Sequence, residues 1–167
     1  MKILAIETCF MSCSLAILNG ENVEYYKYDD RKNMQSELIP QMIQESGIDL
    51  KKIDILAASC GPGTFTGIRI GLAIISGISL GINAKIANIS SLDAVFAEHK
   101  IDEAAIKGIG ENYYYKKQMG DIQYLHFEKL PKNIQIHFPT AIGVGIAATK
   151  IKNFDNDVIP KYVRDYK

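Results

Sequence analysis

The chain has 167 residues, which is enough for one good-sized domain or two small ones. It is 47% hydrophobic and 23% charged, a composition typical of a soluble globular protein. Nineteen basic residues balance 19 acidic ones, which argues against a nucleic-acid binder that acts alone, because such binding rests on excess positive charge.

Two further features predict a cytoplasmic protein. The apolar start of the chain is interrupted at Glu7 with no cleavage pattern behind it, so no signal peptide is expected. Of the three cysteines, Cys9, Cys13 and Cys60, at least one must stay unpaired, and we expect all three to be reduced and mostly buried. No membrane association is expected.

The first hundred residues predict three strands followed by alternating helices and strands. The strands are expected at 2–7, 13–18 and 22–28, with a turn signal at Asn19-Gly20. Helical spacing from Met34 to Ile43 predicts a helix that ends before Gly47. A strand at 53–58, a helix at 66–81, a strand at 84–89 and a helix at 91–99 capped by Ser90 or Ser91 follow. The order β-β-β-α-β-α-β-α is typical of the α/β actin-like or ribonuclease-H-like (ASKHA) fold.

The rest of the chain predicts a second, smaller unit. We expect an actin-like N-terminal domain at 1–100 and a shortened C-terminal α/β subdomain at 101–167. A hairpin at 104–117 turns around Gly110-Glu111-Asn112, the stretch 123–137 has weak strand character, and 141–150 is expected to be a helix. The tail from Ile159 to Arg164 is expected to be extended.

A glycine-rich turn between the predicted strand at 53–58 and the helix at 66–81 is the strongest local signal. It comprises Gly61, Pro62, Gly63, Thr64 and Thr66. A phosphate-binding Walker loop would need a lysine and then a serine or threonine after Gly67, but Ile68 and Arg69 stand there. A dinucleotide fingerprint would need a small residue at position 66. The pattern therefore favours a structural turn over a phosphate site.

The helix after this turn is rich in small residues at helical spacing. Gly67 and Gly71 lie four apart, and Ala73, Gly77 and Gly81 form a second four-spaced row, so another backbone can approach closely. Each interior glycine costs about 0.5–1 kcal/mol of helix stability relative to alanine. A packing role therefore follows, and two interpretations stay open: a buried core helix, or an interface with a partner.

Chemical groups that could support catalysis are sparse. His99, His126 and His137 are scattered, and the chain has no set of ligands typical of a metal site. Cys60 or Ser59 could act as a nucleophile only with a base held nearby. The chain therefore has the pattern of an enzyme fold with little catalytic machinery, which favours a subunit that binds another protein.

Several motifs resemble the bacterial TsaB (YeaZ) family, the dimerisation subunit of the complex that makes threonylcarbamoyladenosine in tRNA. They are Met1 to Thr8 (MKILAIET), Gly61 to Ala73 (GPGTFTGIRIGLA) and Ser90-Ser91-Leu92. Gly110-Glu111 with Tyr113, and Pro160 to Arg164 (PKYVR), are similar to later family motifs. The likeness is dense over residues 1–95 and thin afterwards.

The resemblance implies a non-catalytic subunit with no metal or cofactor of its own. A homologous partner, TsaD, would carry the metal and transfer the threonylcarbamoyl group, and a small ATPase, TsaE, would join the assembly, so ATP and metal belong to partner subunits. Without its partner the chain would form a homodimer, and it would reach tRNA only through the complex. Two helices would form the interface, through Met34, Leu38, Ile39, Met42, Ile43, Gly67, Ile70, Gly71, Ile74, Gly77, Ile78 and Gly81.

The sequence departs from the family pattern at three places. Glu7 stands where the family usually has aspartate, Asn33-Met34 replaces a histidine-containing pair, and Ile106-Lys107-Gly108 replaces a common Asp-Ala-Arg. The main alternative is a small-molecule kinase or ATPase of the actin-type fold, with phosphates bound by the first turn and the loop at 61–67. A protease-like activity through Cys60 or Ser59 is a third hypothesis.

Overall fold

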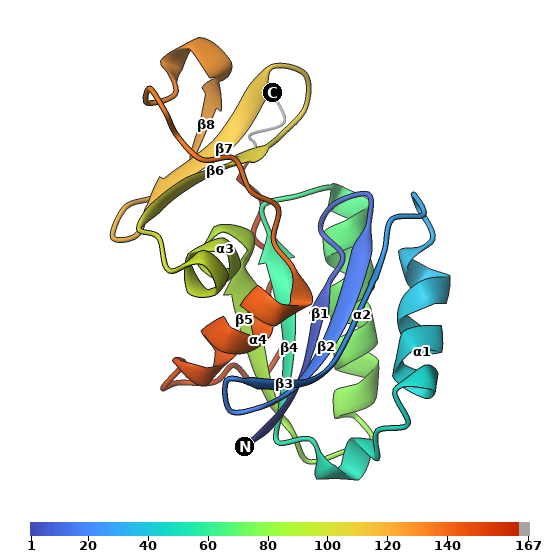
Figure 1. Ribbon diagram of the computed structural model, residues 1–167. Helices are drawn as coiled ribbons and strands as arrows, with labels where there is room; N and C mark the ends of the chain where they lie inside the picture. The colour runs from blue at the N-terminus through green and yellow to red at the C-terminus, as the bar shows by residue number, and fades with distance from the viewer. Residues whose placement is uncertain (164–167) are drawn as a thin grey trace.

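A computed structural model describes residues 1–163 and contains two sheets. The larger sheet has the strand order β3-β2-β1-β4-β5, in which β1, β2 and β3 are antiparallel neighbours and β1, β4 and β5 run parallel (Figure 1). Its strands are β1 (Lys2–Glu7), β2 (Cys13–Asn19), β3 (Asn22–Asp29), β4 (Ile55–Gly61) and β5 (Lys85–Ser90).

Helices cover both faces of this sheet (Figure 1). Because side chains alternate along a strand, Leu4 and Ile6 of β1 point to one face and Ile3 and Ala5 to the other. The first face packs against α1 (Gln35–Glu45) and α2 (Phe65–Ser79). The second packs against α3 (Ser91–His99) and α4 (Ala141–Thr149). A short 3-10 helix, η1 (Leu50–Lys52), leads from α1 into β4. The predicted β-β-β-α-β-α-β-α order and the actin-like fold class are confirmed.

The second sheet is small and antiparallel, with the order β6-β7-β8. It consists of β6 (Glu103–Lys107), β7 (Asn112–Lys117) and β8 (Gln123–His126), followed by the 3-10 helix η2 (Phe127–Lys129). A third apolar cluster, around Leu92, Phe96 and Ile106, joins α3 to this sheet. The domain boundary expected at residue 100 stays a prediction. Helix α4, expected in the C-terminal subdomain, follows the small sheet in the chain and packs against the large sheet (Figure 1).

Two local predictions are corrected by the structure. The strand expected at 53–58 runs from Ile55 to Gly61, because pairing with β5 continues to the partners Gly61 and Ser90. Ser90 occupies the N-cap position of α3 but makes no capping hydrogen bond. Ser91 does not cap the helix either, because its hydroxyl donates to the carbonyl of Pro62 at 2.9 Å. The three cysteines are free and buried, as expected.

The last described segment crosses the free edge of β5. Asp155 forms an antiparallel bridge with Ile86, and the Lys161 amide donates to the carbonyl of Cys60 at 2.6 Å. This segment, residues 155–163, is called the strap below. Arg164, the end of the expected tail, lies outside the described residues.

No helix within residues 1–163 has the length and apolar character needed to cross a lipid bilayer.

Candidate partner interface

The glycine turn places α2 directly against the loop between β1 and β2. The Thr64 amide donates to the carbonyl of Cys9 at 2.6 Å, and the Thr64 hydroxyl accepts from the Gly67 amide at 3.1 Å as the N-cap of α2. A Cβ on Gly63 would lie 2.4 Å from the Cys9 carbonyl oxygen. Protein atoms therefore fill the position in which a phosphate would have to approach these backbone groups.

The turn also contacts the strap. Gly61 has φ +110°, a conformation that favours glycine, and a Cβ there would lie 2.4 Å from the carbonyl oxygen of Lys161. The bond from Gly61 to Pro62 is a cis peptide. Thr66, the last member of the predicted turn, is exposed at the start of α2. The glycine turn thus packs against both the loop between β1 and β2, called the first loop below, and the strap, and it leads directly into α2.

Two of the predicted interface glycines are used inside the chain. The Thr8 hydroxyl donates to the Gly67 carbonyl at 2.7 Å, and a Cβ on Gly67 would lie 2.1 Å from the Thr8 carbonyl oxygen. A Cβ on Gly71 would lie 2.4 Å from Thr8 Oγ1. The close approach that this glycine pair permits is therefore made by Thr8, the residue after β1, and both glycines are buried.

Three predicted interface residues of α1 also lie in the core. Leu38, Ile39 and Met42 are at most 2% exposed and pack with β1, β2 and α2. Met34 and Ile43 are half-buried at the edge of the same cluster. A helix of this kind presents one apolar stripe to the core, which is what the helical spacing records. In this structure the three buried side chains are not available to another chain.

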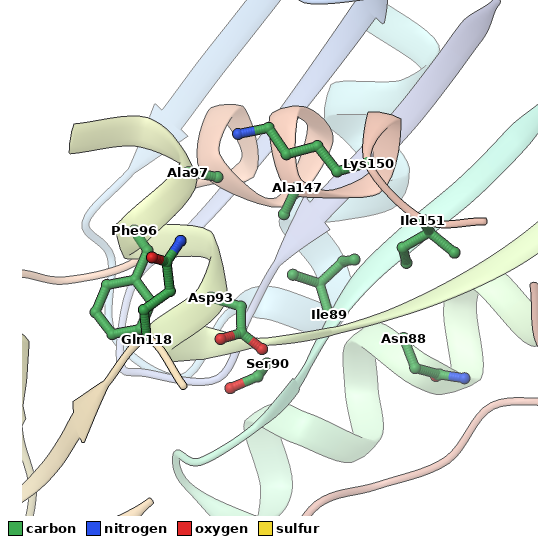
Figure 2. A pocket seen from close by; sticks show the side chains of 10 residues that line it. All are labelled: Asn88, Ile89, Ser90, Asp93, Phe96, Ala97, Gln118, Ala147, Lys150 and Ile151. Carbon is green, nitrogen blue, oxygen red and sulfur yellow. The ribbon is translucent and has the colours of Figure 1, made fainter. Parts of the chain in front are cut away.

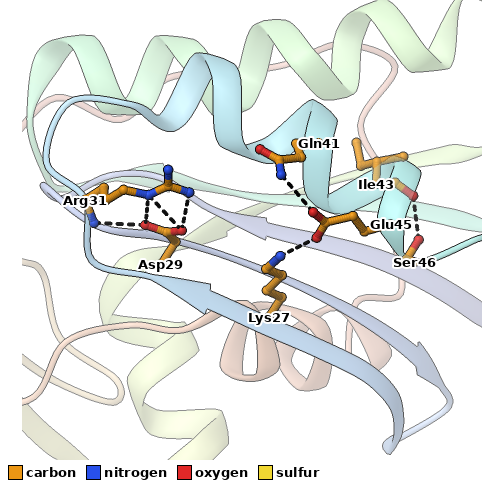
Figure 3. A network of polar contacts seen from close by, with 7 residues as sticks. All are labelled: Lys27, Asp29, Arg31, Gln41, Ile43, Glu45 and Ser46. Atoms are coloured by element: carbon orange, nitrogen blue, oxygen red, sulfur yellow. Dashed lines mark hydrogen bonds and ion pairs between the residues drawn. The ribbon is translucent and has the colours of Figure 1, made fainter.

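The opposite side of α1 is polar and partly tied to β3 (Figure 3). Glu45 forms an ion pair with Lys27 of β3 and accepts a hydrogen bond of 2.8 Å from Gln41. Asp29 and Arg31 form a second ion pair at the end of β3, with 2.7 Å between their charged atoms. Because these polar side chains already pair with each other, this side of α1 offers few apolar groups to a partner.

The remaining predicted residues lie along the outer side of α2. Ile70, Ile74 and Ile78 are half-buried, whereas Gly77 and Gly81 are exposed. In the described part of the chain, a Cβ on Gly77 would have no neighbour within 4 Å, and one on Gly81 would have only the Ile78 carbonyl oxygen at 3.6 Å. Leu80, which the sequence reasoning missed, is 89% exposed. We call this surface, together with exposed Ala73, the outer face of α2.

The groups considered as nucleophiles are enclosed by the sheet. Ser59 is 1% exposed and donates its hydroxyl to the Glu7 carboxylate. Burial raises the pKa of the Cys60 thiol to about 11. Both features oppose nucleophilic attack, which needs an accessible and activated group. Burial also raises the pKa of Glu7 to about 7, against the hydrogen bonds from Ser59 and from the Cys9 amide at 2.7 Å, which lower it.

The histidines do not form a shared site. The rings of His99 and His137 are tilted by 34° to each other with 4.1 Å between their centroids, while His126 lies beside Glu111 at 3.2 Å. Desolvation and the neighbouring His99 lower the pKa of His137. Within the described part of the chain, no group of three or more His, Cys, Asp or Glu residues is placed to hold a metal ion.

Of the cavities in the described structure, one of about 690 Å³ adjoins the outer face of α2 at Leu80, and two others lie away from this face. The smaller, about 300 Å³, is lined by residues of β5, α3 and α4 on the opposite side of the sheet (Figure 2). It contains Ser90, whose buried hydroxyl has no hydrogen-bond partner among the described residues. It also contains Asp93, which pairs with Lys116. The larger, about 620 Å³, lies between the first loop and the small sheet, with Phe10, Tyr28 and Phe138 in its lining.

Comparison with known proteins identifies the family. The family model described as TsaD, tRNA N6-adenosine threonylcarbamoyltransferase, matches residues 32–153. The chain is 33% identical over 109 residues to the tRNA threonylcarbamoyladenosine biosynthesis protein TsaB of Buchnera aphidicola subsp. Baizongia pistaciae, covering 60% of this chain and 49% of that protein. It is 37% identical over 95 residues to TsaB of Escherichia coli K12, covering 55% and 41%. The chain thus spans about half the length of the curated relatives it matches, or less.

Solved structures share the fold. YeaZ from Pseudomonas aeruginosa superposes with a TM-score of 0.68 at 20% identity, covering 88% of this chain and 90% of that one. A crystal structure of an uncharacterised protein with similarity to peptidase YeaZ, also from Pseudomonas aeruginosa, gives a TM-score of 0.75 at 20% identity, covering 98% and 99%. The match of the family model over residues 32–153 shows that the chain belongs to the family that this model describes, TsaD, and the curated relatives to which it is similar are named TsaB.

Proposed function

We propose that this chain is a subunit of the machinery that forms threonylcarbamoyladenosine in tRNA, and that it activates a TsaD-like transferase by binding it through the outer face of α2. Curated relatives named for this biosynthesis support the pathway. The transferase family model and a relative from Mycoplasmopsis synoviae, named as a threonylcarbamoyltransferase and 30% identical over 124 residues, support a homologous partner.

The observation that carries the proposal is the contrast between two pairs of glycines in α2 and just beyond it. Thr8 occupies the space beside Gly67 and Gly71, whereas Gly77 and Gly81 face outward with open space beside them. Among residues 1–163, no atom lies close enough to require a glycine at position 77, where an alanine would stabilise the helix by about 0.5–1 kcal/mol. A partner helix that approaches closely gives these small residues a role.

The positions of the residues that a kinase, an ATPase or a protease would use support a non-catalytic role for this chain. The loop that a kinase or ATPase would use for phosphates packs against Thr8 and Cys9. Ser59 and Cys60 are buried, and no two of the three histidines lie on one helix, as a pair of metal ligands at helical spacing would. We therefore assign the transfer step, its metal and its ATP to partner subunits. We also propose that a TsaE-like ATPase joins the assembly and that the isolated chain forms a homodimer. The chain would contact tRNA only through the complex.

The test uses the full chain and the TsaD-like protein of the same organism. We expect the two to co-elute from a sizing column and to form threonylcarbamoyladenosine only together with the other components of the pathway. Gly77→Gln places a bulky side chain on the outer face without disturbing the core, so it should abolish co-elution and activity. Gly120→Gln introduces the same side chain in the exposed loop after β7, and it should leave both unchanged.

Three outcomes would overturn the proposal. The chain could fail to associate with the TsaD-like protein while folded, or Gly77→Gln could bind as well as the wild type. Binding of ATP with magnesium by the isolated chain at micromolar strength would support a kinase or ATPase instead.

A further inference from the structure

Two segments that are far apart in the sequence meet at the first turn of α2. The ring of Tyr162, in the strap, stacks on Phe65 with 5.4 Å between centroids. The Arg69 guanidinium lies over the Phe65 ring, 3.7 Å from its centroid, and its Nε donates to the Tyr162 hydroxyl at 3.1 Å. We call Phe65, Arg69 and Tyr162 the cationic corner.

The strap is held in place by several bonds to the sheet. The Asn88 side-chain amide donates to Asp155 and to the carbonyl of Asp157, each at 2.9 Å. Its oxygen accepts from the Ile159 amide at 3.0 Å. The hydrogen bond from the Lys161 amide to the Cys60 carbonyl fixes the backbone directly before Tyr162. The Lys161 carbonyl, which lies close to Gly61, fixes it further. The position of Tyr162 beside α2 is therefore set by hydrogen bonds from the strap to β4 and β5.

The cationic corner is exposed, and among residues 1–163 its positive charge has no acidic partner. Phe65 is 43% exposed and Tyr162 40%, and Arg69 is exposed as well. Stacking and the Nε hydrogen bond fix the guanidinium plane, and within residues 1–163 its four terminal N–H groups donate no hydrogen bond to another residue. Among residues 1–163, no carboxylate forms an ion pair with Arg69 or with Lys161, the strap residue before Tyr162.

The corner is continuous with the outer face of α2. Arg69, Ala73 and Gly77 are spaced four apart and all exposed, so they lie in one row on the helix. Arg69 is the single charged residue of α2. A surface with a small apolar stripe and a fixed guanidinium at one end suits a partner helix that carries a carboxylate at the matching end, because a planar guanidinium binds a carboxylate through two parallel hydrogen bonds. Arginine and tyrosine are also the residues enriched among those that dominate binding energy.

We propose that the cationic corner binds a carboxylate of the TsaD-like partner, so that the strap and α2 together form one binding surface. This inference rests on the proposed function and adds the chemistry of the partner's contact. Arg69 supplies the paired hydrogen bonds, Phe65 supports the guanidinium, and Tyr162 orients it.

The experiment measures the affinity of the full chain for the TsaD-like protein by calorimetry at low and high salt. Arg69→Gln should weaken binding about tenfold or more and reduce its salt dependence, because a charge-assisted pair is lost. Arg69→Lys should recover only part of the affinity, since an ammonium cannot form the paired bonds. Tyr162→Phe keeps the stack and removes the hydroxyl, so a smaller loss is expected. Lys132→Gln removes one exposed charge after the small sheet and serves as the control.

The outcomes separate this inference from the function on which it rests. If the wild-type chain does not bind the TsaD-like protein, the proposed function fails and the corner's role falls with it. If the wild type binds and Arg69→Gln binds equally well while keeping its melting temperature, the function stands and the corner is not part of the interface. If Arg69→Gln changes only self-association of the isolated chain, the occupant is a second copy and the proposal is overturned.

Discussion

The Thr8 hydroxyl donates a hydrogen bond of 2.7 Å to the carbonyl of Gly67, a residue 59 positions further along the chain. This contact brings the end of β1 and the first turn of α2 closer than any side chain on Gly67 would allow. The two ends of the glycine stretch therefore have different roles: the first glycines let the fold close, and the last ones remain at the surface.

Substitutions of glycine by alanine should separate these roles. Gly67→Ala is expected to lower the free energy of unfolding by about 1–3 kcal/mol, because the new methyl group overlaps the Thr8 carbonyl. Gly77→Ala has open space and a better helix propensity, so it should raise the free energy by about 0.5–1 kcal/mol. Urea unfolding of both variants checks the prediction, and equal effects would contradict it.

Stability should depend on pH through Glu7. Burial raises the pKa of Glu7 from 4.5 to about 7, so the folded chain holds this proton between those values while the unfolded chain has released it. The contribution of Glu7 is therefore fully present below pH 4.5 and is lost as pH rises to about 7, by an amount on the order of 3 kcal/mol.

Glu7→Gln is the matched test of this dependence. The amide keeps an acceptor for the Cys9 amide and a hydrogen-bond partner for Ser59 but does not titrate. The variant should lose the fall in stability between pH 4.5 and 7 and exceed the wild type at pH 8. Unfolding curves across pH 4–8 measure this, with exposed Glu37→Gln as the control. The same slope in Glu7→Gln and wild type would rule out Glu7 as its source.

The neighbouring serines at the start of α3 should respond differently to removal of the hydroxyl. Ser90 has no hydrogen-bond partner for its buried oxygen among the described residues, so Ser90→Ala should leave the melting temperature unchanged or raise it. Ser91→Ala removes the 2.9 Å bond to the Pro62 carbonyl and should cost about 1 kcal/mol or more. Calorimetric melting of the pair provides the comparison, and a larger loss for Ser90→Ala would contradict the prediction.

The strap should loosen without global unfolding when Asn88 is changed. Asn88→Asp replaces a donor to Asp155 by a second carboxylate, so the two side chains repel. We expect amide hydrogen exchange at Ile159 and Lys161 to accelerate roughly tenfold or more, as in local opening. Exchange within β1 should stay slow. Asn22→Asp, at an exposed position in β3, is the control, and unchanged protection of Lys161 would contradict the role given to Asn88.

Much of the architecture is contained in local patterns of the sequence. The nearly continuous apolar runs of β1 and β4 are typical of strands that are buried on both faces, and the structure places helices on both sides of them. The glycine stretch predicts a tight strand-to-helix turn, and Thr64 does cap α2. The same stretch carried the family resemblance, which the comparisons confirm.

The candidate interface could not be resolved in the same way. Helical spacing groups Leu38, Ile39 and Met42 with the isoleucines of α2, because periodicity records an apolar face and not what covers it. In the structure the α1 side chains fill the core, while Gly77 and Leu80 remain outside. The glycines at 67 and 71 and those at 77 and 81 show the same four-residue spacing, and the approach of Thr8 to the first pair distinguishes them.

By itself, the sequence determined the order of the elements, the fold class and the position of the glycine turn, because each depends on residues that are neighbours in the chain. The tertiary structure alone decided which glycines are free and which aromatic ring supports Arg69. Tyr162 reaches Arg69 across 93 positions, through a strap that hydrogen bonds to β5 hold against the sheet. Contacts of that kind depend on the path of the folded backbone, for which a single sequence contains no local signal.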